Sequence, residues 1–76
     1  MREKILEILA DAEEDILTYE GDNMMEEGII NSFAVIELVS DLEDAFDIEI
    51  DAKYVVAENF ANKETIIALV EKIVNG

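Results

Sequence analysis

The chain has 76 residues, lacks cysteine, histidine and proline, and carries twenty acidic against five basic residues, for a formal net charge of −15. This length allows one small domain, and the composition excludes disulfide cross-links and a Cys/His zinc site. No basic residue lies between Lys4 and Lys53, so we expect the surface to repel nucleic acid and anionic membranes and to attract basic proteins or cations, although such acidity can also serve solubility alone.

The N-terminal stretch shows helical spacing of its apolar residues. A helix over about residues 2–17 is predicted by Ile5, Ile8, Leu9, Ala12 and Ile16. The stretch lacks the apolar run of a signal peptide, and no segment of the chain reaches transmembrane length. We therefore expect a cytoplasmic protein without stable membrane insertion.

A long loop over residues 18–31 precedes a second helix over about residues 32–46. Loops of this length are rarely structureless in a compact domain, so we expect this one to be anchored by Met24, Met25, Ile29 and Ile30. The second helix is predicted by a core stripe of Val35, Leu38, Val39, Leu42 and Phe46.

The segment 47–62 is ambiguous, because Ile48 and Ile50 alternate with acidic residues like a short strand that has no partner strand. We predict an extended turn and then a short helix started by Asp51. A last helix over about residues 63–74, capped by Asn62, is predicted by Ile66, Leu69, Val70 and Ile73. Together these elements predict a single all-α domain over residues 1–76, a small four-helix bundle with three longer helices and one short helix.

The second helix carries a further set of residues at helical spacing: Phe33, Ile36, Glu37, Ser40 and Asp44. The outer face of a surface helix is ordinarily polar, whereas Phe33 and Ile36 are apolar. Two interpretations stay open. The apolar pair closes over the edge of the core, or it forms the centre of a partner-docking face with an acidic rim.

Ser32, at the start of this helix, has three interpretations. A serine nucleophile needs a base within hydrogen-bond reach, but the chain has no histidine, and Lys53 and Lys63 are isolated in sequence. We therefore predict no catalytic residue. Asn31 and Ser32 are both residue types that cap helix N-termini. A helix N-terminus also stabilises an anion, so a phosphodiester on Ser32 would be well placed. Capping and attachment both stay open.

A weaker pattern concerns metal binding. The acidic residues at positions 1, 3, 5 and 12 of a calcium-binding loop would be Asp47, Glu49, Asp51 and Glu58. Ala52 stands where that loop needs glycine for its sharp turn. We therefore predict no specific metal site, and only diffuse attraction of cations.

The stretch EGIINSFAVIELVSDLEDAFDIEI resembles the phosphopantetheine attachment site of the acyl carrier protein family. That site typically reads glycine, two residues, Asp-Ser-Leu, and then a helix with a Val-Glu-Leu core and a Glu/Phe-Asp end. In register with it are Gly28, Ser32, the Ile-Glu-Leu of residues 36–38, and residues 43–50. The four-helix pattern and the acidic balance extend the resemblance over the whole domain.

The resemblance implies a carrier and not an enzyme. A carrier-protein synthase, or phosphopantetheinyl transferase, would attach 4′-phosphopantetheine from coenzyme A to Ser32, and the thiol of this arm would hold an acyl or aminoacyl group as a thioester. The partners would be this synthase, a loading ligase and acyl-transfer enzymes with basic docking patches, and we expect a monomer. The alternative is an unmodified acidic helical adaptor that docks basic proteins.

Two residues depart from the family pattern. The family usually has aspartate before the serine, where its carboxylate helps to hold the synthase's magnesium, and this chain has Asn31. An uncharged amide oxygen is a weaker magnesium ligand, so Asn31 bears on how readily Ser32 is modified. Phe33 stands where Leu or Met is commoner, and it enlarges the apolar contact beside the arm.

The stretch from Phe46 to Ile66 is longer than in typical fatty-acid carriers. Its length, and Phe60 near its end, are similar to the stand-alone D-alanyl carrier proteins of teichoic acid synthesis. The cargo stays open among fatty acyl, D-alanyl, polyketide and peptide groups.

Overall fold

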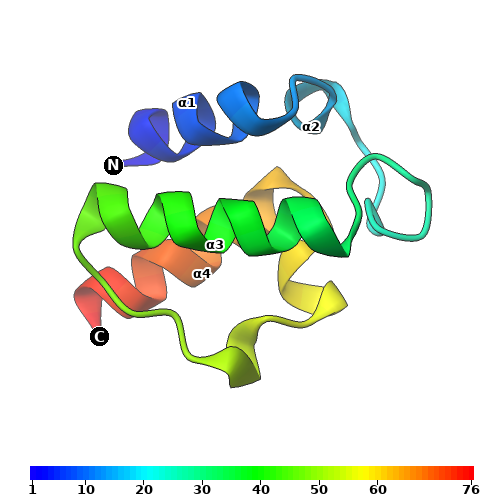
Figure 1. Ribbon diagram of the computed structural model, residues 1–76. Helices are drawn as coiled ribbons and strands as arrows, with labels where there is room; N and C mark the ends of the chain where they lie inside the picture. Colours follow the sequence, from blue (N-terminus) through cyan, green and yellow to red (C-terminus); the bar gives the residue numbers. More distant parts are fainter.

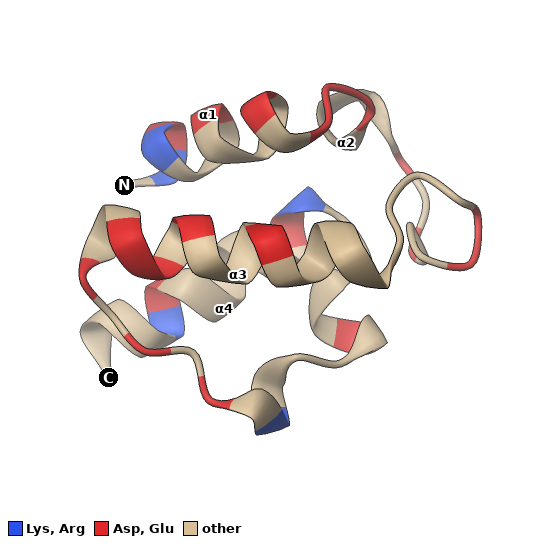
Figure 2. Ribbon diagram, viewed as in Figure 1, with Lys and Arg blue, Asp and Glu red and all other residues tan.

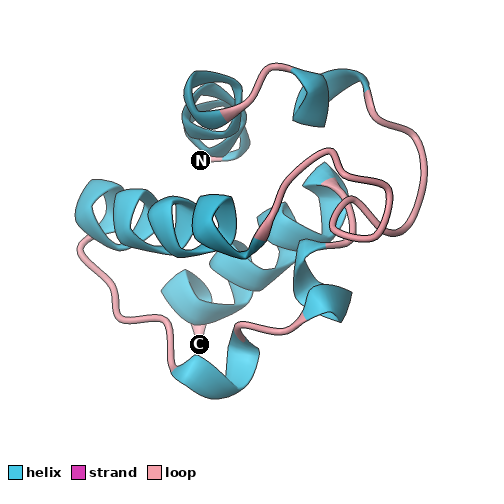
Figure 3. Ribbon diagram, turned by 45° about the vertical axis from the view of Figure 1, so that its right-hand side comes forward, coloured by secondary structure: helices cyan, strands magenta, loops and turns pink.

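The computed structural model describes all 76 residues as helices joined by loops, without a strand (Figure 1; Figure 3). Four α-helices and two short 3₁₀ helices follow along the chain: α1 (Arg2–Ala12), α2 (Asp15–Thr18), α3 (Ser32–Phe46), η1 (Ala52–Tyr54), η2 (Ala57–Phe60) and α4 (Lys63–Asn75). The predicted small all-α bundle with three long helices and one short helix is thus confirmed, but the short helix is not where the sequence placed it.

The helices enclose a core made only of apolar side chains. Helix α1 packs against α3 and α4, η2 packs on α4, and α4 passes behind α3 in Figure 1. The core contains 14 buried residues, none of them polar. Completely buried are Ile5, Leu9, Ile16, Met24, Leu38, Leu42, Phe60, Ile66 and Val70. The three predicted apolar stripes therefore face the core, except that Ala12 is exposed and that Ile67, outside the predicted stripe, is buried.

The first predicted helix is broken in two. Glu13 is extended, with φ −162° and ψ 110°, and the short α2 begins at Asp15. The local run of acidic residues explains the break, because carboxylates are unfavourable at the C-terminal end of a helix and favourable at an N-terminal end. The helical spacing of apolar residues continues across the break in the sequence, because α2 places Ile16 in the core.

The loop before α3 is anchored as predicted, with Met24 and Ile30 buried and Met25 and Ile29 half-buried. It is also tied to the start of α4. The Met24 backbone N–H donates to the Ala61 carbonyl at 3.1 Å. Residues 19–31 are therefore held against the rest of the fold, and they lead the chain into α3 from a fixed position.

The prediction of one short helix after Asp51 was wrong. Asp51 caps η1 by accepting from the Lys53 backbone N–H at 3.0 Å, but the helical turn stops at Tyr54 and resumes only at Ala57. Between the two 3₁₀ turns, the β-branched Val55 and Val56 leave helical geometry, and Val56 is extended with φ −130° and ψ 156°. Branching at Cβ disfavours helix and favours extended backbone, which accounts for the split.

Helices α3 and α4 begin and end as the sequence predicts to within one residue. Helix α4 is capped by Asn62, whose side-chain oxygen accepts from the Thr65 N–H at 3.0 Å, while the Thr65 hydroxyl accepts from the Asn62 N–H at 3.2 Å. This reciprocal pair satisfies two N–H groups that a helix start otherwise leaves open. Helix α3 ends at Asp47, which adopts the left-handed conformation with φ 52°.

Candidate functional site

Ser32 is the first residue of α3, and its neighbour Asn31 does the capping. The Asn31 side-chain oxygen accepts from the Ala34 backbone N–H at 2.9 Å, so Asn31 is the N-cap residue. The Ser32 side chain is exposed and makes no hydrogen bond within the protein. Of the two residues that could have capped this helix, one satisfies the backbone and the other keeps a free hydroxyl.

The backbone at the start of α3, around Ser32, favours a negatively charged group. The N–H groups of Ser32 and Phe33 open the helix and have no acceptor in the protein, whereas the third N–H, that of Ala34, is taken by Asn31. Open N–H groups together with the positive end of the helix dipole favour a negative group at this end. A phosphate ester on the Ser32 oxygen would lie beside them.

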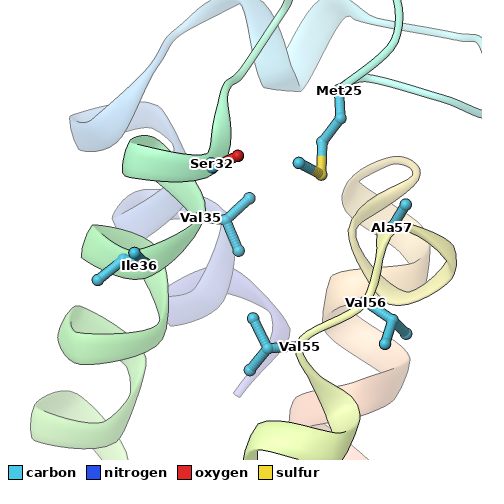
Figure 4. Close-up of a pocket in the computed structure, with 7 residues that line it drawn as sticks. All are labelled: Met25, Ser32, Val35, Ile36, Val55, Val56 and Ala57. Carbon is cyan, nitrogen blue, oxygen red and sulfur yellow. The ribbon is translucent and has the colours of Figure 1, made fainter.

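A surface pocket of about 280 Å³ lies beside Ser32 (Figure 4). One wall is the first turn of α3, and the other is the extended segment between η1 and η2, with Met25 at the rim. Val35 projects from α3 into the gap. The pocket is lined by Met25, Ser32, Val35, Ile36, Val55, Val56 and Ala57. None of these side chains can take a proton, so the pocket offers Ser32 no general base.

The outer face of α3 exposes apolar and acidic side chains together. Phe33 is 71% exposed and Ile36 is 65% exposed, so the interpretation that they close over the edge of the core is wrong. Glu37, Ser40 and Asp44 continue the same face and are exposed. Figure 2 shows acidic residues along α3 and no basic residue on it. The sequence-predicted set Phe33, Ile36, Glu37, Ser40 and Asp44 thus forms one surface, the α3 face.

The calcium-loop pattern has no counterpart in the structure. No group of three or more His, Cys, Asp or Glu side chains is arranged to hold a metal ion. The Asp51 carboxylate instead caps η1, and the Glu43 carboxylate accepts from the Ile50 backbone N–H at 2.8 Å. The acidic residues of this segment therefore hold the turn after α3 in shape.

The groups with shifted pKa values lie away from Ser32. A side-chain hydrogen bond from Arg2 lowers the pKa of Glu64, and the same bond raises the pKa of Arg2. Desolvation, followed by the hydrogen bond to Glu27, raises the pKa of Tyr19. These groups join α1 to α4 and close the loop before α3, so their effect is on the scaffold.

The pocket was the feature that sequence reasoning missed. Its walls come from residues 25, 32, 35, 36 and 55–57, which only the fold brings together. Val55 and Val56 gave a signal, because they are an apolar pair outside any helical stripe.

None of the helices has the length and apolar character needed to cross a membrane.

Comparison of the sequence with protein-family models and with curated proteins gave no match. The function is therefore inferred from the residues and geometry of this chain.

Proposed function

We propose that this chain is an acyl or aminoacyl carrier protein, which holds its cargo as a thioester on a 4′-phosphopantetheine arm attached to Ser32. The observation that carries the proposal is the free, exposed Ser32 hydroxyl at the start of α3, with open backbone N–H groups on one side and an apolar pocket on the other. The resemblance around Gly28 and Ser32 supports the same assignment.

The residues present fit such an arm. The open N–H groups of Ser32 and Phe33 would face the phosphate, and the uncharged pocket would accept apolar parts of the arm without desolvating a protein charge. Once attached, the arm supplies a thiol, which this cysteine-free chain does not contain. The chain positions the serine oxygen, and the base that takes its proton would come from the synthase.

The α3 face supports docking of partner enzymes. Its exposed Phe33 and Ile36 offer an apolar centre directly beside Ser32, and Glu37 and Asp44 continue it with negative charge. A synthase, a loading ligase or an acyl-transfer enzyme with an apolar patch rimmed by Lys and Arg would complement this surface. Such docking would bring the partner's active site to the arm.

Intact mass spectrometry tests the proposal. The protein is incubated with coenzyme A and a synthase of broad specificity, and a mass gain of one phosphopantetheinyl group is expected. Ser32→Ala should lose the gain completely. Thr18→Ala, which removes an exposed hydroxyl outside the α3 face, should keep it. No gain under conditions that modify a control carrier, or a gain that persists in Ser32→Ala, would contradict the proposal.

A second candidate is the unmodified adaptor, which the exposed Phe33 and Ile36 also favour, since their exposure does not depend on an arm. The adaptor binds a basic partner equally well with and without the Ser32 hydroxyl. The carrier needs that hydroxyl for every reaction of its cargo. Binding and transfer measured on Ser32→Ala therefore separate the two.

A further inference from the structure

The three methionines are the only sulfur-containing residues of this cysteine-free chain, and they lie in different surroundings. Met24 is completely buried in the core, whereas its neighbour Met25 is half-buried. Met1 is 48% exposed, but it precedes α1 at the opposite end of the molecule from Ser32 (Figure 1). An oxidant that reaches the protein therefore meets the thioethers of Met1 and Met25 before that of Met24.

Met25 lies where a change of its side chain would act on Ser32. Both residues line the same surface pocket, and the Met25 side chain extends from the loop toward the gap between α3 and Ala57 (Figure 4). A surface pocket that admits water also admits hydrogen peroxide, which is larger by a single oxygen atom. The thioether of Met25 is thus within reach of a small peroxide, while the fold shields Met24.

Oxidation changes the chemical character of this side chain. A peroxide transfers an oxygen atom to the thioether sulfur, so that the sulfur is oxidised to the sulfoxide and hydrogen peroxide is reduced to water. A flexible apolar side chain is thereby converted into a polar one that accepts hydrogen bonds. Among the side chains that line the pocket, only that of Ser32 can donate a hydrogen bond. The sulfoxide oxygen therefore either accepts from the Ser32 hydroxyl or turns outward into water, and in both cases the surroundings of Ser32 change.

We propose that Met25 is an oxidation site that regulates attachment at Ser32: its sulfoxide slows transfer of the phosphopantetheine arm, and reduction of the sulfoxide restores the rate. The thioether belongs to the apolar surface around Ser32, together with the exposed Phe33 and Ile36. A synthase that covers this surface has to desolvate the sulfoxide, which costs free energy when no donor replaces water. The inference rests on the proposed carrier function and adds a regulation of its attachment site.

The test uses the protein before an arm is attached, since the thiol of the arm would itself be oxidised. After brief treatment with hydrogen peroxide, peptide mass mapping is expected to find sulfoxide at Met1 and Met25 but not at Met24. The rate of attachment by the synthase should then fall by roughly fivefold relative to the untreated protein. Methionine sulfoxide reductases, one for each sulfoxide epimer, should restore it. An unchanged rate in protein oxidised at Met25 would overturn the inference, and so would oxidation of Met24 ahead of Met25.

A matched pair of leucine variants assigns the effect to Met25. Met25→Leu retains the exposed Met1, and its rate of attachment after peroxide should equal its own untreated rate. Met24→Leu removes the neighbouring sulfur by an exchange that protein cores usually tolerate, and its rate should fall after peroxide as in the unsubstituted protein. A slowed rate in peroxide-treated Met25→Leu, or an equal response of the two variants, would contradict the assignment.

Methyl NMR spectra separate this inference from the carrier function. A lack of attachment to the untreated protein counts against the carrier function itself. Sulfoxide at Met25 is expected to shift the methyl signals of Val35 and Val55, which line the same pocket, whether or not an arm can be attached. The signals of Val74, near the end of α4 and outside the pocket, should stay in place. Unshifted signals of Val35 and Val55 in the oxidised protein would overturn the inference.

Discussion

Helices α3 and α4 have the same N-cap residue type, asparagine, yet their first turns are used differently. Asn31 and Asn62 each accept a backbone N–H three positions on, at 2.9 Å and 3.0 Å. At the start of α4, the polar side chains of Asn62 and Thr65 make further hydrogen bonds within the protein. The Asn62 amide also donates to the Gly21 carbonyl at 3.1 Å, and the Thr65 hydroxyl lies 3.0 Å from the Asn59 carbonyl. At α3 the adjacent Ser32 hydroxyl is left free.

Cap chemistry alone therefore does not distinguish a scaffold position from a candidate site. The difference lies in the surroundings: the start of α4 is half-buried against the loop before α3, whereas the start of α3 faces solvent. A half-buried polar group must find protein partners, while an exposed one remains available for chemistry. Four predictions test this division between a structural helix start and the proposed functional one.

The largest effect is expected from removing the α4 cap. Asn62→Ala loses the cap and the bond to Gly21, so the free energy of unfolding should fall by about 2 kcal/mol and the melting temperature by roughly 10 °C. Asn31→Ala loses only the cap and should cost about 0.5–1 kcal/mol. Urea and thermal unfolding of both variants measure the difference. Equal losses of stability would show that the two helix starts do not differ in their structural role.

Charge reversal on the α3 face is expected to slow docking. Changing Glu37 and Asp44 to Lys should lower the second-order rate of modification by a basic synthase by roughly tenfold at low ionic strength. The difference should shrink as salt is added, since salt screens exposed charges. Glu7→Lys with Asp11→Lys on α1 changes the net charge equally and is the control. A control that slows as much would show that only net charge matters.

Restoring a carboxylate before Ser32 should act on modification and not on the fold. Asn31→Asp keeps an N-cap of equal quality, so stability is expected to change by less than about 0.5 kcal/mol. A carboxylate holds magnesium more strongly than an amide oxygen, so attachment by a synthase that uses magnesium should be faster. Mass gain followed over time compares the two proteins, and identical time courses would refute this role of Asn31.

The smallest effect concerns the ion pair at the start of α4. The Arg2 guanidinium contacts both carboxylate oxygens of Glu64, at 2.9 Å and 2.6 Å, and lowers the pKa of Glu64 from its ordinary value of 4.5. Since this pKa is lower in the folded protein than in the unfolded one, the pair stabilises the fold above the unfolded pKa. That stabilisation is lost as the pH falls through the folded pKa.

Arg2→Ala should therefore raise the pKa of Glu64 toward 4.5, as measured by NMR titration of its side chain. Both side chains are more than half exposed, so only a slight change of stability is expected. An unchanged pKa of Glu64 in Arg2→Ala would show that the contact is not maintained in solution.

The sequence predicted α3 and α4 closely because two independent signals agree at each. An apolar stripe at helical spacing coincides with an Asn cap, and both stripes face the core. The break at Glu13 escaped prediction because Ile16 keeps the helical spacing across it. The split at Val55 was missed because Asp51 is a good helix start and says nothing about how far the helix extends.

The candidate site was predictable only where it lies within one helix. Phe33 and Ile36 were identified from their helical spacing, because one helix face follows from spacing alone, whereas Asn31 and Ser32 were identified from cap preference and from the family resemblance. Exposure of Phe33 and Ile36 could not be decided, since an apolar stripe does not reveal which of two faces meets the core. The pocket requires three segments to meet, and their meeting depends on tertiary packing.

The hydrogen bonds that join the start of α4 to residues 17 and 21 also bear on the order of folding. The cap of α3 joins residues 3 positions apart, whereas the Asn62–Gly21 bond spans 41 positions and the Lys63–Leu17 bond 46. Closing a long loop costs more entropy than closing a helical turn, so the long-range bonds form late. Asn62→Ala should then mainly accelerate unfolding, and Asn31→Ala should mainly slow folding, in stopped-flow kinetics. Opening of the domain is expected to begin at the start of α4, before the helix that carries Ser32 unravels.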